Sequence, residues 1–217
     1  DEQKVVSTTE GEFCSKSVII AGGAHPRKLG VPGEDKFAKR GVFYCATCDG
    51  PNFAGKVIAM AGGGDSGMTE ALLLSRIVTK VIVIEVMPQL GACKMLQEKV
   101  SGNPVIEVLC GTKIEAIRGG ENVEAVDLLN MQTGQRSTLK VDGVSVRVGI
   151  LPNTDYLKGS VLLNERGQII VNENMETVIP GIFAAGDIRQ NSPWQISTAV
   201  GDGAMAALSL GKYLSQL

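Results

Sequence analysis

The sequence predicts an α/β protein in which a parallel β-sheet carries an appended antiparallel β-meander. Three observations in the 217 residues support this fold class. Short apolar runs end in glycines, with a helical segment between two of them. Shorter runs of alternating polarity follow between residues 112 and 148. Two segments rich in Pro and Gly bracket this block, as they do when one domain is inserted into another.

The parallel sheet is predicted from the order strand, glycine turn, helix, strand. The run KVIAMAGGGDSG (56–67) is β-rich and ends in glycines, and KVIVIEV (80–86) is a second β-rich run. Between them, MTEALLLSRIVT (68–79) has helical propensity and contains neither Gly nor Pro. Such a βαβ unit of about 30 residues places its two strands in parallel. Residues 91–100 predict a further helix, and residues 104–111 a further strand.

The meander and the flanking elements follow from shorter patterns. The run SVIIAGG (17–23) predicts a strand, and the tail over 195–217 predicts a long helix rich in small residues. Antiparallel strands with turns between them are predicted for the alternating runs 112–120, 122–130, 136–141 and 143–149.

The domain organisation follows from two segments with the composition of linkers, HPRKLGVPGED (25–35) and GILPNTD (149–155). We therefore expect an inserted domain over residues 31–149. Residues 1–30 and 150–217 then belong to one other domain, which the insertion interrupts.

Composition excludes several function classes. The formal net charge is −2 and the isoelectric point is near 5.6, so nothing electrostatic favours nucleic acid or an anionic membrane as a partner. No apolar run approaches the roughly 20 residues of a membrane-spanning helix. Five cysteines are too few for a secreted disulfide scaffold, and their odd number fits a reducing compartment. We expect a cytoplasmic protein.

The turn AGGGDSG (61–67) has the G-x-G-x-x-G spacing of a dinucleotide-binding loop. It follows a predicted strand and precedes a predicted helix, which is the context the motif requires. The first glycine allows the tight turn, the second lets the pyrophosphate approach, and the third lets helix and strand pack closely. The alternative is a glycine-rich turn without a ligand. The predicted contacts are Gly62, Gly63, Gly64, Asp65, Ser66 and Gly67.

Glu85 ends the next predicted strand, where an acid would accept hydrogen bonds from the ribose 2′-hydroxyl of NAD. A 2′-phosphate would meet this carboxylate, and no basic residue follows in 86–90. The sequence therefore favours NADH over NADPH. The alternative for Glu85 is a solvated strand end.

The segment CATCDG (45–50) contains Cys45 and Cys48 with Asp49 directly after them. A zinc site needs about four N or S ligands, but the chain has one histidine and no second CxxC pair. A redox-active dithiol–disulfide pair fits better, with Asp49 moving the proton of thiol exchange. The alternative is two structural thiols. Because a disulfide does not accept a hydride from NADH directly, we expect a flavin between them.

These residues together resemble the low-molecular-weight thioredoxin reductase family. GVFYCATCDG, GGGDSG, LPNTDYL and TVIPGIFAAGD occur in that family's order and at its spacings, over essentially the whole chain. The flavoprotein subunit of alkyl hydroperoxide reductase is similar in further details: CDGP, IEVMPQL and GILPNTDYLKG. Both families insert a nicotinamide domain, here 31–149 with the CxxC pair, into an FAD domain, here 1–30 and 150–217.

The resemblance implies roles for individual residues. Cys45 would attack the partner's disulfide, while Cys48 would lie next to the flavin, with Asp49 as acid and base. The remaining FAD contacts would be Gly186, Asp187, Gln195 and Ile196. The alternatives without a flavin contact are a strand-to-helix turn at Gly186–Asp187 and a helix cap at Gln195. The implied partner is a thioredoxin-like protein or a peroxiredoxin-system protein, and the implied assembly is a homodimer.

Three departures from the family pattern have consequences. The family's N-terminal βαβ with its own G-x-G-x-x-G for FAD is absent, so we expect this chain to bind FAD weakly or not at all. Gly22 and Trp194 replace a usual Thr and a common Arg. The NADPH-type HRRxxxR segment is replaced by Glu85 and uncharged neighbours, in agreement with NADH. A non-catalytic NADH-binding fragment therefore stays open as an alternative.

The resemblance also implies a domain movement. The family alternates nicotinamide and disulfide at the flavin by swivelling the inserted domain. We expect the hinges at Leu29–Gly33 and Gly149–Asn153.

Overall fold

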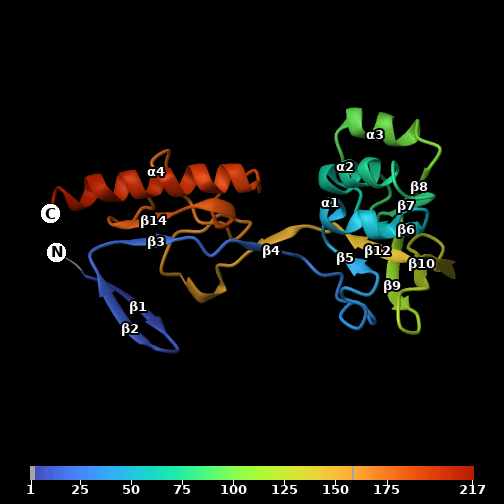
Figure 1. Cartoon of the computed structure of the whole chain (residues 1–217), viewed down its shortest axis with the longest axis horizontal. Coiled ribbons are helices and arrows are strands. Elements are labelled where there is room, and N and C mark those ends of the chain that lie inside the picture. Colours follow the sequence, from blue (N-terminus) through green and yellow to red (C-terminus); the bar gives the residue numbers. More distant parts are fainter. Residues whose placement is uncertain (1–2, 158) are drawn as a thin grey trace. The chain divides into compact units, whose positions relative to one another are not determined.

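The computed structural model describes residues 3–157 and 159–217. The chain divides into two compact units. Unit 1 comprises residues 1–25 and 150–217, and unit 2 comprises residues 26–149 (Figure 1).

Unit 2 is built on a five-stranded parallel sheet with the strand order β5-β12-β6-β7-β8. Its members are β5 (Val42–Phe43), β6 (Val57–Ala61), β7 (Lys80–Ile84), β8 (Ile106–Leu109) and β12 (Gly143–Val146). The predicted βαβ unit is β6, α2 (Asp65–Leu74) and β7, and the further helix is α3 (Lys94–Ser101). The predicted α/β fold with a parallel sheet is confirmed.

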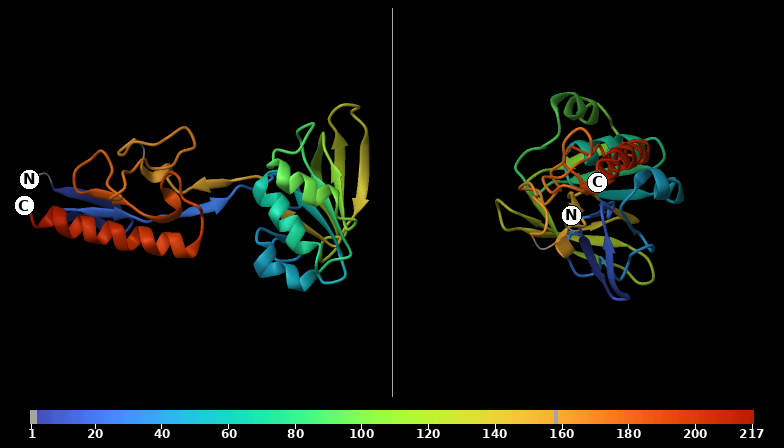
Figure 2. Two further views of the ribbon diagram at one scale, coloured as in Figure 1. Left: turned by 90° about the horizontal axis from the view of Figure 1, so that it is seen from above. Right: turned by 90° about the vertical axis from the view of Figure 1, so that its left-hand side faces the viewer.

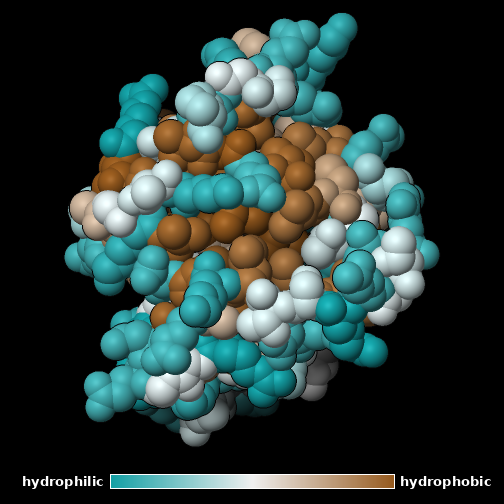
Figure 3. All heavy atoms as spheres, turned by 90° about the vertical axis from the view of Figure 1, so that its right-hand side faces the viewer, coloured by the Kyte–Doolittle hydropathy of each residue, from teal (hydrophilic) through white to brown (hydrophobic). Residues whose placement is uncertain are grey.

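Both faces of this sheet are covered, which explains why its strands read as nearly continuous apolar runs. Met60 and Val83 face the helix side, where Met68 and Leu74 of α2 pack on them. The opposite face packs against the meander. Figure 2 shows the helices and the meander on opposite sides of the sheet. Figure 3 shows one face of unit 2 on which apolar atoms gather at the centre, within a rim of hydrophilic side chains.

The meander is a three-stranded antiparallel sheet with the order β11-β10-β9. Its strands are β9 (Thr112–Arg118), β10 (Ala125–Asn130) and β11 (Arg136–Lys140). The prediction that 143–149 adds a fourth meander strand is wrong. β12 lies in the parallel sheet between β5 and β6, and all four of its residues are buried. Ser145 and Arg147 made this run alternate between polar and apolar residues, as a half-exposed strand does. Ser145 is nevertheless fully buried, so the polar positions do not mark a solvent-facing side.

Helix α2 is shifted relative to the expected 68–79. It begins at Asp65, inside the glycine turn, and ends at Leu74. The N–H groups of Ile77 and Val78 both bond to the carbonyl of Leu74, which closes the helix. Val78 then turns into the core beneath α2. Two short turns precede this region: α1 (Ala46–Asp49) and the 3-10 helix η1 (Gly50–Phe53).

Unit 1 contains less regular structure. The hairpin β1 (Lys4–Thr8) and β2 (Gly11–Ser15) precedes β3 (Val18–Ile20), which pairs in parallel with β14 (Ile182–Ala184). The long α4 (Ile196–Leu214) packs on β14 through Ala206 and Phe183. Short elements complete it: η2 (Asp155–Leu157), η3 (Gly186–Ile188) and the strand pair β4 (Ala24–Pro26) and β13 (Ile150–Pro152). Within the described ranges, no helix is long and apolar enough to cross a membrane.

Candidate active site

The two cysteines of the CxxC segment lie at either end of a single helical turn, α1. Cys45 and Cys48 form a disulfide, with their Cα atoms 5.4 Å apart. Cys45 is the N-cap residue of α1, and its Sγ atom accepts the backbone N–H of Cys48 at 3.2 Å. Cys48 is exposed, whereas Cys45 and Asp49 are half-buried. An N–H donor and a helix N-terminus both favour negative charge, so the surroundings of the Cys45 sulfur suit a thiolate.

A buried carboxylate lies beneath this turn. The backbone N–H of Ala46, itself fully buried, donates to Oε2 of Glu70 at 3.3 Å. Oε1 of the same carboxylate pairs with the guanidinium of Arg147. Burial lowers the pKa of Arg147. Glu70 belongs to α2 and Arg147 follows β12, so three elements meet under the disulfide.

The three motif glycines of the loop after β6 differ in what surrounds them. Gly62 has a φ of +111°, and a Cβ there would lie 2.3 Å from the carbonyl oxygen of Arg147. A Cβ on Gly67 would lie 2.1 Å from the carbonyl oxygen of Gly62. In contrast, a Cβ on Gly64 would meet no atom within 4 Å. The first and third glycines are therefore required by the chain's own packing, while the second borders open space.

The N-terminus of α2 opens at this loop. Gly64 is its N-cap, and the first helical hydrogen bond runs from Met68 to Gly64. The N–H groups of Asp65, Ser66 and Gly67 thus precede the helical ladder, as in anion-binding helix termini. Oδ1 of Asp65 accepts the N–H of Cys93 at 2.7 Å, which ties the loop to the start of α3. This geometry has room for the pyrophosphate of a dinucleotide, because Gly64 has no side chain and borders open space.

Glu85 directly follows β7 and is buried, so the alternative of a solvated strand end is wrong. Its carboxylate accepts the N–H of Gly63 at 2.6 Å and the N–H of Met87 at 2.9 Å. Two of about four lone-pair sites of a carboxylate are thereby engaged, and others stay available to a ribose hydroxyl. Burial, and secondly the charge of Glu85, raise the pKa of the nearby Cys110 thiol.

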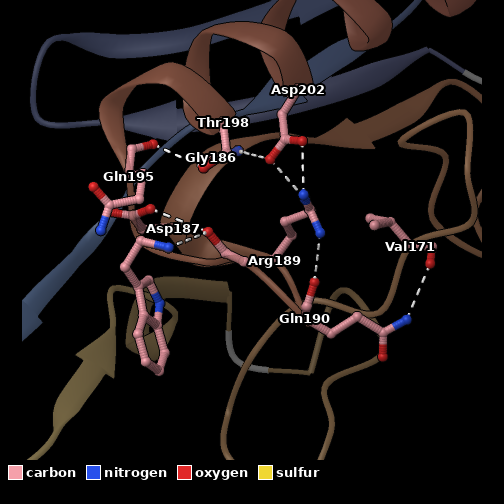
Figure 4. Close-up of polar contacts among 10 residues, drawn as sticks. Val171, Gly186, Asp187, Arg189, Gln190, Gln195, Thr198 and Asp202 are labelled. Atoms are coloured by element: carbon pink, nitrogen blue, oxygen red, sulfur yellow. Dashed lines mark hydrogen bonds and ion pairs between the residues drawn. The ribbon is translucent and has the colours of Figure 1, made fainter. Parts of the chain in front are cut away.

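Unit 1 contains a second polar cluster, around the end of β14 (Figure 4). Gly186 adopts a φ of +79°, and its N–H donates to the carboxylate of Asp202 on α4 at 3.1 Å. Arg189 donates to both oxygens of Asp202, at 2.6 and 2.7 Å. Oδ1 of Asp187 accepts the hydroxyl of Ser192 at 3.1 Å. The bidentate ion pair therefore fixes the turn that carries Gly186 and Asp187.

Gln195 and Ile196 lie at the start of α4, next to this cluster in the chain. Gln195 occupies the N-cap position, but its side chain makes no capping hydrogen bond. Its carbonyl accepts the hydroxyl of Thr198 at 2.8 Å. Both residues are exposed, Ile196 to 87%. Trp194, with a φ of 54°, is tied to the cluster by its N–H bond to Ser192.

Gly22 has a steric explanation. A Cβ at this position would lie 3.0 Å from the hydroxyl of Tyr156 and 3.1 Å from Cδ1 of Ile188. A threonine side chain would crowd both groups, because Cβ contacts this short are rare. This glycine therefore matches its own surroundings in unit 1.

The predicted site residues thus fall into two groups. The disulfide, the glycine loop and Glu85 belong to unit 2, and Gly186, Asp187, Gln195 and Ile196 belong to unit 1. The ion pairs that brace each group, Glu70–Arg147 and Arg189–Asp202, were not predicted from the sequence. Each pair leaves one signal in the sequence, which is an acid within a helical run of otherwise apolar or small residues: Glu70 in one helix and Asp202 in the other.

Comparison with known proteins identifies the family. Residues 1–203 match the family described as pyridine nucleotide-disulphide oxidoreductase. The chain belongs to this family. It is 41% identical over 217 residues to thioredoxin reductase of Bacillus subtilis, covering all of this chain and 69% of that protein. The expected resemblance to low-molecular-weight thioredoxin reductases is therefore confirmed.

Longer members of the family are similar to the same extent. The chain is 42% identical over 200 residues to an NADH dehydrogenase of Ferdinandcohnia aciditolerans, covering 92% of this chain and 38% of that protein. It is 41% identical over 200 residues to an alkyl hydroperoxide reductase subunit of Staphylococcus aureus, covering 92% of this chain and 39% of that protein. The chain thus spans well under half of these two relatives.

Solved structures of family members show the same fold. The Lactococcus lactis thioredoxin reductase has a TM-score of 0.83 and 38% identity, covering 99% of this chain and 71% of that one. The Streptococcus pyogenes thioredoxin reductase has a TM-score of 0.81 and 40% identity, covering 100% of this chain and 71% of that one.

Proposed function

We propose that this chain is part of an FAD-dependent disulfide reductase that passes electrons from NADH to the disulfide of a thioredoxin-like protein through Cys45 and Cys48. The observation that carries the proposal is the presence of a disulfide and a dinucleotide loop in one compact unit, packed against the same helix, α2. The 41% identity to a thioredoxin reductase supports the choice of acceptor.

The nucleotide would bind at the N-terminus of α2. The free space beside Gly64 takes the pyrophosphate, and the N–H groups of Asp65 and Ser66 face its charge. Glu85 would accept a hydrogen bond from the ribose 2′-hydroxyl, and its negative charge would repel a 2′-phosphate. The carboxylate is buried and is held in place by two N–H donors. This is the basis for NADH over NADPH.

The disulfide exchange uses residues of this chain. The Cys45 thiolate attacks one sulfur of the partner's disulfide, which breaks that S–S bond and forms a mixed disulfide. Cys48 then loses its proton and attacks Cys45, re-forming the Cys45–Cys48 bond and releasing the partner as a dithiol. Asp49, directly after Cys48 in the chain and half-buried, would take and return this proton.

FAD would be held in part by unit 1. The residues that fit it in kind are Gly186, whose φ favours glycine, and Asp187, of which only Oδ1 is engaged within residues 3–157 and 159–217. Gln195 and Ile196 would contact it from the exposed first turn of α4. When bound, a flavin supplies the relay between a hydride donor and a disulfide, which cannot take a hydride directly.

A peroxiredoxin-system protein is the second candidate acceptor. The observation in its favour is the 41% identity to the alkyl hydroperoxide reductase of Staphylococcus aureus. A competition assay with a thioredoxin and a peroxiredoxin-system protein as alternative acceptors separates the two. A third outcome, nucleotide binding without turnover of either acceptor, would favour a non-catalytic NADH-binding role.

The visible absorption spectrum of the purified chain, before and after anaerobic addition of NADH, tests the proposal. Because the chain alone is expected to bind FAD weakly or not at all, FAD is supplied in excess, and the expected results are a flavin absorption that bleaches with NADH and two further thiols that become alkylatable. The Cys45→Ser variant serves as the control, because it retains nucleotide binding while its remaining Cys48 thiol is alkylated to the same extent before and after NADH. Absence of both NADH binding and flavin bleaching would contradict the proposed function.

A further inference from the structure

The buried Glu70–Arg147 ion pair is the feature of unit 2 that the proposed function leaves unexplained. Its carboxylate has two separate partners, the Ala46 N–H through Oε2 and the Arg147 guanidinium through Oε1. The side chains of Glu70 and Arg147 are only 11% and 21% exposed. A pair buried to this extent costs desolvation energy, and apolar residues of similar volume would often stabilise a core equally well. Stability alone therefore does not explain why the pair is present.

One end of the pair reaches the disulfide. Ala46 is joined by a peptide bond to Cys45, and its N–H is the first of α1. The Glu70 carboxylate thus contacts the residue next to Cys45, whose sulfur would carry thiolate charge when the pair is reduced. A carboxylate in this place opposes that charge, unless a cation compensates it.

The other end reaches the dinucleotide loop. The N–H of Arg147 donates to the carbonyl of Ala61 at 2.8 Å, and its own carbonyl lies against Gly62. Its Cβ lies 3.8 Å from the position of a Cβ on Gly67. Nε of Arg147 is buried and has no partner within residues 3–157 and 159–217. Arg147 is therefore held firmly by the loop, with Glu70 as its acid partner.

We propose that Glu70 and Arg147 are positioning residues of the Cys45–Cys48 pair, which together set how readily the disulfide is reduced. Glu70 orients α1 through Ala46, and Arg147 cancels the carboxylate charge that would otherwise disfavour the reduced state. The inference rests on the proposed function of this pair as the redox centre. It predicts opposite effects for the loss of the two charges.

The test is a redox titration of the full chain against dithiothreitol at constant pH, with the Cys45 and Cys48 thiols counted by alkylation and mass spectrometry. In this exchange dithiothreitol is oxidised to its cyclic disulfide, the Cys45–Cys48 bond breaks, and the two thiol protons pass to the cysteines. The measured quantity is the equilibrium constant for reduction. No flavin, nucleotide or acceptor protein is required.

We expect R147Q to lower this constant about threefold or more, because the buried carboxylate is left without its cation. We expect E70Q to raise it by a similar factor, because the amide oxygen can still accept the Ala46 N–H while the negative charge is gone. The double variant E70Q/R147Q pairs two neutral amides and should return the constant close to that of the unchanged chain.

The matched control is E107Q, which removes a carboxylate from an exposed ion pair with Lys80 in the same unit and should leave the constant unchanged. Circular dichroism identifies any variant that does not fold. Shifts of R147Q and E70Q in the same direction, or no shift in folded protein, would overturn the inference. So would a double variant that shifts further than either single one. Because the titration needs only the disulfide, failure to reduce thioredoxin would contradict the proposed function and leave this result standing.

Discussion

The two units of this chain differ in how far their apolar faces are buried and in how their polar groups are paired. Unit 2 covers both faces of its sheet and points its helix terminus and its disulfide outward. Unit 1 satisfies the polar groups of its cluster among themselves, while an apolar face of α4 stays exposed: Ile196 at 87%, Val200 at 67% and Leu208 at 67%. Unit 2 therefore contains both the glycine loop and the disulfide, whereas unit 1 contains a turn held by an ion pair and a helix with an exposed apolar face. The following predictions test this contrast.

The largest effect is expected in unit 1, from Asp202→Ala. This change leaves the Arg189 guanidinium, only 14% exposed, without its bidentate partner and removes the acceptor of the Gly186 N–H. Loss of one partner of a buried pair costs about 3–5 kcal/mol. Trp194 is the single tryptophan of the chain, so its fluorescence during urea unfolding follows unit 1 alone. Unfolding of unit 1 at an unchanged urea concentration would contradict a bracing role.

A smaller but more selective effect is expected in unit 2, from alanine at two loop glycines. Gly67→Ala places a Cβ against the Gly62 carbonyl. It should lower the free energy of unfolding by about 1–3 kcal/mol and should also weaken NADH binding. Gly64→Ala meets no atom within 4 Å, so it should leave stability unchanged and still weaken NADH binding, about tenfold or more. Thermal unfolding by circular dichroism and titration of NADH fluorescence measure the two quantities. Full NADH affinity in Gly64→Ala would place the nucleotide elsewhere.

An intermediate effect concerns the pH dependence of Cys110. Burial and the Glu85 carboxylate raise the pKa of this thiol, so less thiolate is present at a given pH than in an ordinary thiol, and the side chain is less accessible than the exposed Cys14 and Cys93. Alkylation of Cys110 should be slowest and rise last with pH, and Glu85→Gln should lower the pKa. Because the folded-state pKa is raised, the associated stability is present at neutral pH and lost as the pH rises through that value. Equal rates at all three cysteines would contradict this environment.

The smallest effect is expected from Lys80→Ala. Its ion pair with Glu107 is exposed, with side-chain exposures of 44% and 47%, so its loss should cost less than about 1 kcal/mol. Thermal unfolding in low and high salt checks this value. A larger loss would show that this ion pair contributes more to the stability of unit 2 than its exposure predicts.

Local patterns in the sequence were sufficient for much of this fold. Residues 56–86 predict the central βαβ unit because strand, turn and helix signals all lie within one short segment. The Cys45–Cys48 spacing predicts the disulfide for the same reason. Local patterns failed for β12, whose place between β5 and β6 depends on partners far away in the chain.

The bracing ion pairs were missed on the same physical grounds. Glu70 and Arg147 are 77 positions apart, and no periodicity links an acid on a helix to an arginine after a distant strand. Asp202 and Arg189 are closer, at 13 positions, but a loop separates them. The assignments of Gly186, Asp187, Gln195 and Ile196 to a flavin, the hinges at Leu29–Gly33 and Gly149–Asn153, the homodimer and the cytoplasmic location stay predictions.

The place of β12 has a consequence for the order of events during synthesis. The last strand of this sheet to leave the ribosome is the one that joins β5 to β6, so both strands expose an unpaired edge until the entire meander has emerged. Contacts of such long sequence separation slow folding. Arg147 emerges directly after this strand. The nascent chain therefore carries Cys45 and Cys48 throughout the synthesis of residues 49–146, before the cation beneath them arrives, and their chemical environment is the last part of unit 2 to mature.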